Sequence, residues 1–261
     1  MKKYSIVAFM VINLLSSCGK DDAPKNTGGE FKGAEVMLHS GKAWSVVKVN
    51  NDGIPTELTV SINDAALNSV PVGAGTGGTH QHENSIVLPM HDQVKTVTPF
   101  KHIVLDYNPS GHDPAAVYGL PHFDFHYYLM SEADRLAIPP YNVDSSKFLL
   151  FPAREYFPAN YVAIPGGVPQ MGTHWIDVTS PELSGQTFVQ TFIYGSYNGK
   201  VTFYEPMVTL NYLKTTSAFN RTIPQPAKVQ VSGYYPTKME IRKNNGFTDV
   251  TLTTFVYREA Q

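Results

Sequence analysis

The chain has 261 residues, of which 42% are hydrophobic, 20 are Lys or Arg and 22 are Asp or Glu. This length fits one large domain or two small ones, and the apolar content is sufficient for a core. Because the charges nearly cancel and no basic run occurs, nucleic acid is not an expected partner.

The N-terminus, residues 1–17, is predicted to be a lipoprotein signal peptide. Lys2 and Lys3 form a positively charged start, and the apolar stretch after them is too short to span a membrane. Leu15-Ser16-Ser17-Cys18 resembles a bacterial lipobox, in which the cysteine is lipidated. The alternative is a plain signal peptide with an incidental cysteine. Since Cys18 is the only cysteine, internal disulfides, thiolate metal sites and cysteine catalysis lack support.

Residues 18–32 are predicted to be a lipidated cysteine followed by a flexible linker, because the segment is rich in Gly, Pro and charged residues. Buried acyl chains would anchor Cys18 to the membrane. The acidic stretch at residues 19–22 resembles the surface-export signal of Bacteroidota lipoproteins. We therefore expect an exported protein, lipid-anchored to the cell envelope at the outer membrane, with display at the cell surface as one option.

Short stretches rich in β-branched and aromatic residues recur along the chain, separated by turn residues. They predict strands within residues 34–62, 85–90, 100–109, 121–130 and 173–178, and hairpins over residues 187–210 and 237–259. Asn198-Gly199 and Asn244-Asn245-Gly246 are typical hairpin turns.

Few helices are expected, and all of them are short. Asn63 and Ser131 are predicted N-caps, and a third helix is expected between Ser146 and Tyr156 inside a Pro- and Gly-rich segment. Residues 33–261 therefore form, in this interpretation, one mainly β domain, an antiparallel barrel-like or sandwich fold with a few short helices.

The segment PHFDFHYY, residues 121–128, is the most informative part of the chain. Side chains alternate between the two faces of a strand, so His122, Asp124 and His126 share one face and the aromatic rings share the other. His122 and His126 lie about 13 Å apart along a flat strand, at about 3.3 Å per residue. Both can reach one ion only if the strand is strongly coiled or bulged.

A second segment, PGGVPQMGTHWID, brings His174 into a predicted strand. We expect His122, Asp124, His126 and His174 to form a metal site, with Zn²⁺ favoured over Cu, Ni or Fe for a thiol-free set of ligands. The residues expected to support these ligands or to line their pocket are His112, Trp175, Asp177 and Glu205. Two alternatives are a metal-free acid–base cluster and a structural hydrogen-bond network in a polar barrel interior.

Three other features are weaker. His80 and His82 lie two residues apart and are interpreted as part of a surface loop, with an accessory metal site as the alternative. His112 is interpreted first as a turn residue, although its place ten residues before His122 also suits the mouth of the same site. Residues 73–78 match G-x-G-x-x-G, but no strand precedes them and no helix follows, so nucleotide binding is not expected.

Three long motifs resemble the TTHB210-like (DUF5602) bacterial family over roughly residues 33–256. They are HIVLDYNPSGHDPAAVYGLPHFDFHYYLM, VPQMGTHWID and TFIYGSYNGKVTFYEPMVTL. The resemblance places the family's histidine-rich signature on His112, His122, Asp124, His126 and His174, and its EPM element on Glu205, Pro206 and Met207. It implies a β-rich fold and a secreted or envelope location. Since no activity is established for that family, it supports the site without naming a reaction.

The sequence thus favours an envelope lipoprotein whose β-rich domain carries a metal-binding His/Asp cluster. An open coordination position would make it a metal-dependent hydrolase. The alternative is a non-catalytic surface binding or assembly protein, in which the cluster is a structural polar network. Homo-oligomerisation and an unidentified small-molecule ligand are compatible with both hypotheses.

Overall fold

The computed structural model describes residues 28–74 and 84–261. The predicted signal peptide and Cys18 lie outside the described residues, as do His80, His82 and most of the Gly-rich stretch at residues 73–78.

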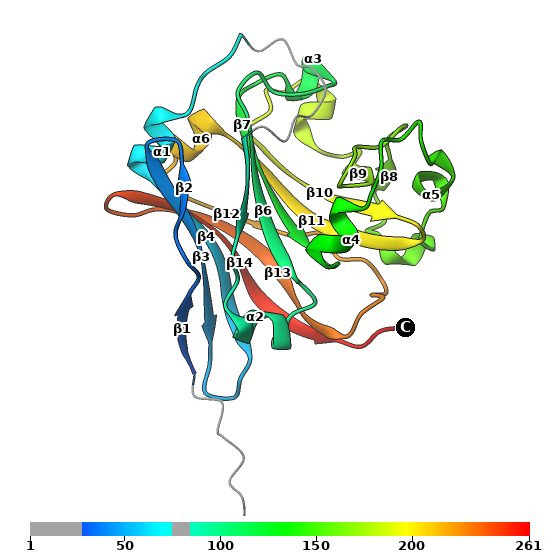
Figure 1. Cartoon of the computed structure of the whole chain (residues 1–261), viewed down its shortest axis with the longest axis horizontal. Coiled ribbons are helices and arrows are strands. Elements are labelled where there is room, and N and C mark those ends of the chain that lie inside the picture. Colours follow the sequence, from blue (N-terminus) through cyan, green and yellow to red (C-terminus); the bar gives the residue numbers. More distant parts are fainter. Residues whose placement is uncertain (1–27, 75–83) are drawn as a thin grey trace, which may run out of the picture.

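Fourteen strands in the described residues form two separate antiparallel sheets of seven strands each (Figure 1). The strands of sheet A, along the sheet, are β1 (Gly29–Lys32), β3 (Gly41–Val49), β4 (Pro55–Asn63), β14 (Phe247–Arg258), β13 (Gly233–Lys243) and β12 (Ala218–Thr222), with β2 (Val36–Leu38) pairing on β3. Those of sheet B are β5 (Ser85–Leu88), β6 (His102–Asn108), β7 (His122–Tyr128), β11 (Lys200–Thr209), β10 (Gln190–Tyr197), β9 (Thr173–Asp177) and β8 (Tyr161–Ala163).

The helices of the described residues are all short. They are α1 (Asp64–Ser69), α2 (Asp92–Val97), α3 (Ala115–Tyr118), α4 (Glu132–Leu136), α5 (Ser145–Leu149) and α6 (Leu210–Thr215), with 3₁₀ turns η2 (Arg154–Tyr156) and η3 (Pro181–Ser184). Helix α1 contacts β3 and β4, α6 contacts β7 and β11, and the two helices touch each other, so they join the two sheets at one end. None of the helices among residues 28–74 and 84–261 has the length and apolar character needed to cross a bilayer.

The main core lies between the sheets. Val47 and Leu58 of sheet A and Phe123, Phe125 and Tyr127 of sheet B are fully buried in one cluster. Phenyl and phenol rings bury large apolar areas and therefore dominate such a core. The fold is consequently a sandwich, which confirms the mainly β prediction and selects the sandwich over the barrel.

The hairpin and cap predictions are confirmed. Asn198 and Gly199 both have positive φ, 51° and 74°, as a type I′ turn requires. The side chains of Asn63 and Ser131 accept hydrogen bonds from the backbone N–H groups of Ala66 and Asp134 at the starts of α1 and α4. Polar caps and Asn-Gly turns act locally, which is why the sequence locates them well.

Two boundaries differ from the predictions. The flexible linker was expected to reach residue 32, but residues 29–32 form β1, which pairs with β3. The helix expected between Ser146 and Tyr156 is split into α5 and η2, with Pro152 in the intervening segment. A proline cannot donate the backbone hydrogen bond that a continuous helix needs there.

The outer face of sheet B, opposite the core, is buried as well. All seven residues of β7 are buried. Two smaller apolar clusters lie on this face, one including Tyr128, Met171 and Phe203 and the other including Tyr118 and Phe188. The loops that contribute Tyr118, Met171 and Phe188 therefore cover the outer face.

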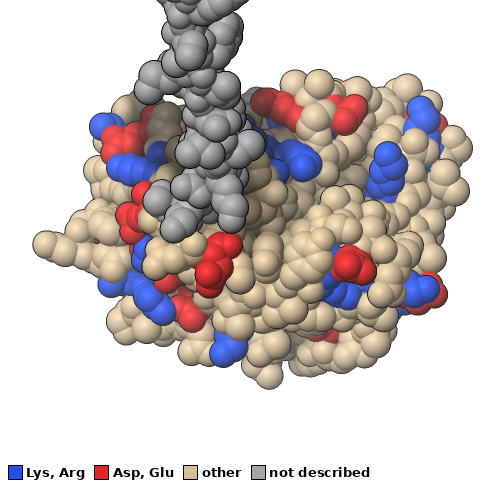
Figure 2. All heavy atoms as spheres, turned by 90° about the horizontal axis from the view of Figure 1, so that it is seen from below, with Lys and Arg blue, Asp and Glu red and all other residues tan. Residues whose placement is uncertain are grey.

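The molecular surface carries few charges. Figure 2 shows Lys and Arg side chains interspersed with Asp and Glu on the face seen from below, with uncharged residues between them. Charges of both signs thus lie near one another on this face. Within sheet A, Lys48 Nζ lies 2.9 Å from Glu57 Oε2.

Candidate metal centres on the outer face of sheet B

Strand β7 separates its aromatic and titratable side chains as the sequence predicts. Phe123, Phe125 and Tyr127 belong to the core between the sheets. His122, Asp124 and His126 therefore point to the outer face, where each has no solvent exposure. Burying so many ionisable groups is unfavourable unless each is paired or binds an ion, so the partners of these side chains decide what this face can do.

The three β7 residues divide between two groups, each of which offers three ligand atoms within 4.8 Å of one another. Group 1 is His112, His122 and Asp124, and group 2 is His126, His174 and Glu205. Asp124 and His126 are alternate residues of β7, so the two groups are neighbours on the sheet.

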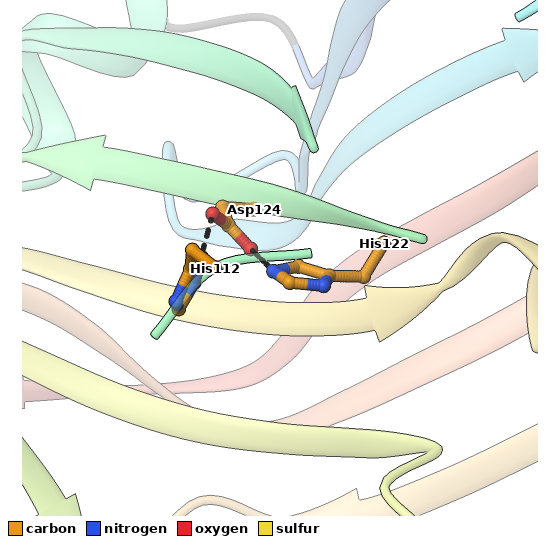
Figure 3. A group of neighbouring side chains, drawn as sticks. All are labelled: His112, His122 and Asp124. Atoms are coloured by element: carbon orange, nitrogen blue, oxygen red, sulfur yellow. Dashed lines mark ion pairs between the residues drawn. The ribbon is translucent and has the colours of Figure 1, made fainter. Parts of the chain in front are cut away.

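In group 1, the Asp124 carboxylate lies between two imidazoles (Figure 3). Asp124 Oδ1 is 3.2 Å from His122 Nε2, and Asp124 Oδ2 is 3.8 Å from His112 Nε2. His112 comes from the loop between β6 and β7, and His122 and Asp124 come from β7 itself. Asn108 of β6, opposite His122 in the strand register, donates from Nδ2 to Asp124 Oδ2 at 2.7 Å.

The hydrogen bonds of group 1 fix which imidazole nitrogen carries the proton. His112 Nδ1 is 2.9 Å from the Asp113 carbonyl oxygen, and His122 Nδ1 is 2.6 Å from the Leu120 carbonyl oxygen. Because a carbonyl oxygen only accepts, each Nδ1 must donate. In the neutral imidazoles both Nε2 atoms then present lone pairs to Asp124, an arrangement that needs a cation or a proton between them.

The pKa values of group 1 follow from burial and from the carboxylate. Burial lowers the pKa of His112 and outweighs the attraction of Asp124. Burial also acts to lower the pKa of His122, but the charge of Asp124 and its hydrogen bond outweigh it, so the pKa is raised. The two imidazoles of one group thus favour different protonation states.

In group 2, all three ligands come from strands of sheet B. His126 Nε2 of β7 is 3.3 Å from Glu205 Oε2 of β11, and His174 Nε2 of β9 is 3.9 Å from the same oxygen. His174 lies opposite Gly195 in the pairing of β9 with β10. The pairing of the strands of sheet B therefore brings all three candidate ligands together, and no loop residue takes part.

A second carboxylate, that of Asp106, lies against the other ring nitrogen of His126. His126 Nδ1 lies 2.8 Å from Asp106 Oδ2 of β6, and the Ser85 hydroxyl donates to the other Asp106 oxygen. A carboxylate on the far nitrogen of a ligating histidine is the usual support of a metal site, because it fixes the ring and makes Nε2 more basic. Asp106 has no solvent exposure, so its support is well ordered.

The same carboxylates shift the pKa values of group 2. Burial acts to lower the pKa of His126, but Glu205 and Asp106 outweigh it and raise the pKa to about 10. Burial raises the pKa of Glu205 to about 7 against the opposing charge of His126. In the metal-free state His126 is therefore the preferred holder of the shared proton.

The spacings within each group are longer than those of short charge-assisted hydrogen bonds. Charge-assisted N–H···O bonds are about 2.7–2.9 Å long, as at His126 Nδ1 and Asp106, whereas the spacings inside the groups are 3.2, 3.3, 3.8 and 3.9 Å. Ligand atoms at about 2.0–2.1 Å from a tetrahedral Zn²⁺ lie roughly 3.3 Å apart. The spacings of 3.2 and 3.3 Å match that separation, whereas those of 3.8 and 3.9 Å exceed it.

The ring of Phe203 packs against both histidines of group 2. Its ring centre is 4.8 Å from that of His126 and 5.3 Å from that of His174. A Cβ on Gly195 would come within 2.1 Å of a ring carbon of Phe203, so only glycine allows the ring to take this place. The role of Gly195, inside a strand, is thus to leave room for Phe203.

Of the predicted metal ligands, all four lie in these groups, but not as one centre. His122 and Asp124 belong to group 1, and His126 and His174 belong to group 2. Strand β7 pairs with β6 without a bulge, so His122 and His126, four residues apart, stay separated along it. His112 and Glu205, which were expected to support the ligands or to line their pocket, supply the third candidate ligand of groups 1 and 2.

Trp175 and Asp177 do not take part, which corrects their assignment to the pocket. Trp175 alternates with His174 along β9 and belongs to the core, where its ring stacks on Phe157 with centres 3.8 Å apart. Asp177 Oδ1 accepts hydrogen bonds from the backbone and hydroxyl of Thr179. Both residues were assigned to the pocket because they follow His174 closely in the sequence. Alternation along β9 directs their side chains to the face opposite His174.

Sequence reasoning missed Asp106 and Asn108. Both lie in HIVLDYN, a predicted strand, and alternate with apolar residues of the core. The alternation of polar and apolar residues in this strand could have indicated them. It identifies them as site residues only once β6 is known to pair with β7, which places Asp106 opposite Asp124.

No known protein family, curated protein or solved structure matched this chain in comparisons made for all three. The chemistry of groups 1 and 2 is therefore the basis for assigning a function.

Proposed function

We propose that this protein is a metal-binding lipoprotein of the bacterial cell envelope, in which groups 1 and 2 each bind one transition-metal ion. The observation that supports this most is the set of imidazole–carboxylate spacings between 3.2 and 3.9 Å. All four are longer than the about 2.7–2.9 Å of charge-assisted hydrogen bonds, and the two shorter ones match the ligand separation around a tetrahedral ion. Zn²⁺ is the favoured ion for imidazole and carboxylate ligands, with Fe, Cu and Ni as alternatives.

Each group supplies two imidazoles and one carboxylate, which leaves coordination positions open. Catalytic zinc sites have three protein ligands of this kind and an open position for water. Metal-dependent hydrolysis is therefore the reaction class to test first.

The first experiment is metal analysis of the purified protein by inductively coupled plasma mass spectrometry. We expect two equivalents in the unaltered protein and about one each in His122→Ala and His174→Ala. Asp249→Asn is a matched control, because Asp249 is a hydrogen-bonded carboxylate on sheet A, remote from both groups. Absence of metal after reconstitution, with the variants as stable as the unaltered protein, would refute the proposal.

A second candidate is a non-catalytic binding or assembly protein in which the cluster is a structural polar network. The observation that favours it is His126, whose two nitrogens face Asp106 and Glu205 at 2.8 and 3.3 Å. A protonated His126 would pair with both carboxylates and satisfy group 2 without metal. This function predicts no bound metal, together with a large loss of stability on substituting Glu205.

The envelope location rests on the lipobox ending at Cys18 and on the signal peptide before it. Metabolic labelling with a palmitate analogue is expected to mark the unaltered protein but not Cys18→Ser. The relationship to the TTHB210-like family is likewise a proposal, supported by the three motifs quoted above.

A further inference from the structure

A cavity of about 430 Å³ lies on the outer face of sheet B, within the range of about 300–1,000 Å³ typical of small-ligand pockets. Its wall includes His112 of group 1 and His174 of group 2. These are the most exposed ligands of their groups, with 16% and 12% of their side chains accessible. The cavity therefore borders one candidate ligand of each group.

The rest of the wall is mainly apolar. Ile164, Ile176, Ile193 and Met207 line it, and the last three belong to the apolar cluster around Tyr118 and Phe188. Such a wall favours a hydrocarbon group over water.

Tyr118 adds a hydrogen-bond donor without a partner. Its side chain lines the cavity and is 4% exposed, and its hydroxyl makes no hydrogen bond within the described residues. The ring is fixed by Phe188, with ring centres 5.1 Å apart. A buried hydroxyl without a partner is unfavourable, and an acceptor atom of a ligand would remove that cost.

The charge of the metal-loaded site favours an anion. A divalent ion in group 1 is offset only by Asp124, which leaves a net positive charge. In group 2, Glu205 and Asp106 together balance the ion. Asp113 also lines the cavity but is exposed, where solvent and salt screen its charge.

We propose that the cavity binds an organic carboxylate with an apolar body. The carboxylate group lies toward the ions of groups 1 and 2 and accepts a hydrogen bond from Tyr118, and the apolar body packs on Ile164, Ile176 and Ile193. This inference rests on the proposed function, because the positive charge that attracts the carboxylate is that of the bound ions.

The test is isothermal titration calorimetry of the zinc-loaded protein with acetate, butyrate, hexanoate and octanoate. Each buried methylene contributes about 0.8 kcal/mol, so affinity is expected to rise about fourfold per methylene until the cavity is filled. Hexylamine has the same body and the opposite charge and is expected not to bind. Hexylphosphonate distinguishes a carboxylate site from a phosphate-type site, and tighter binding of the phosphonate would overturn the choice of head group.

Two variants locate the ligand without touching a metal ligand. Tyr118→Phe removes only the hydroxyl and is expected to weaken hexanoate binding at least tenfold. Ile164→Asp places a charge on the apolar wall at a partly exposed position. It is expected to abolish the rise in carboxylate affinity with chain length. Both are expected to retain two equivalents of zinc.

The outcomes separate this inference from the proposed function. Two bound zinc ions with no carboxylate binding, or with equal binding of hexylamine, would overturn the inference and leave the metal sites intact. Hexanoate binding that survives removal of the metal with a chelator would also overturn it. Failure to bind zinc at all would overturn the proposed function and, with it, the inference.

Discussion

Group 1 takes its third ligand from a loop and orients its histidines with neutral backbone carbonyls, whereas group 2 takes every ligand from a strand and orients His126 with a carboxylate. His122 Nδ1 donates to the Leu120 carbonyl, but His126 Nδ1 lies against Asp106. The same set of donors is thus placed in two different electrostatic environments. Group 2 is expected to bind its ion more tightly and to depend more on pH, and group 1 is expected to keep the net positive charge.

The largest effect should come from removing the metal. A bound ion stabilises the fold by about 4 kcal/mol when free metal exceeds the dissociation constant about 1,000-fold, or roughly 10 °C in unfolding temperature for a chain of this size. We expect a chelator to lower the unfolding temperature by about twice that amount in the unaltered protein.

The same measurement separates the groups. His122→Ala and His174→Ala should each show about half of the chelator effect, whereas the sheet A variant Asp249→Asn should show all of it. Equal and complete effects in both histidine variants would indicate that the groups hold no separate ions.

The second prediction compares the carboxylates in the metal-free protein. Glu205→Gln removes one partner of a buried charged histidine, which typically costs about 3–5 kcal/mol. Asp124→Asn should cost less, about 1 kcal/mol, because His122 can then lose its Nε2 proton, and the amide can accept from Asn108 and donate to that nitrogen. Urea denaturation in the presence of a chelator measures both. Similar losses in the two variants would remove the electrostatic distinction between the groups.

The third prediction concerns the pH dependence of the metal-free protein. The pKa of His126 is raised from 6.5 to about 10 in the folded state, so its contribution to stability is complete below pH 6.5 and is lost as the pH rises through about 10. The raised pKa of Glu205, from 4.5 to about 7, acts in the same direction at lower pH. The free energy of unfolding should therefore fall as the pH rises above neutral, with a slope for His126 of at most about 1.4 kcal/mol per pH unit.

His126→Gln provides the control, since it removes the titrating group of group 2 and should flatten the decline above pH 7. Zinc should flatten it too, because metal binding replaces the proton on Nε2. A decline of the same slope in His126→Gln would assign the pH dependence to residues outside group 2.

The sequence was most informative where structure is decided locally. The turn at Asn198-Gly199, the cap at Asn63 and the alternation of β7 each depend on a few adjacent residues, and each was correctly predicted. The division of the core side from the site side of β7 follows from the same alternation. These features together define the fold class and one strand of the site.

What could not be predicted depends on strand pairing. Glu205 and Asp106 meet His126 because β11 and β6 flank β7, and no local pattern encodes that order. His112 reaches Asp124 through the path of a loop. The site was consequently expected as one centre that combines the three residues of β7 with His174, whereas the pairing of the strands divides it into two.

The smallest predicted effect concerns the residues that hold the ligands in place. Asn108 donates to Asp124 Oδ2 at 2.7 Å, and Asn244 donates to Asp249 Oδ2 at the same distance on sheet A. Removing a residue that orients a metal ligand typically weakens metal binding 10–100-fold. Because Asn108 is neutral, Asn108→Ala should weaken metal binding at group 1 by about tenfold, the lower end of that range. Metal binding at group 2 should not change.

Competition with a chromogenic chelator resolves the two affinities, and Asn244→Ala is the matched control, expected to change neither. Asp106→Asn should act on group 2 instead and more strongly, since it removes a charge as well as an orienting acceptor. If Asn108→Ala weakened both sites equally, the ions would share ligands across Asp124 and Asp106, and the two groups would be one binuclear centre.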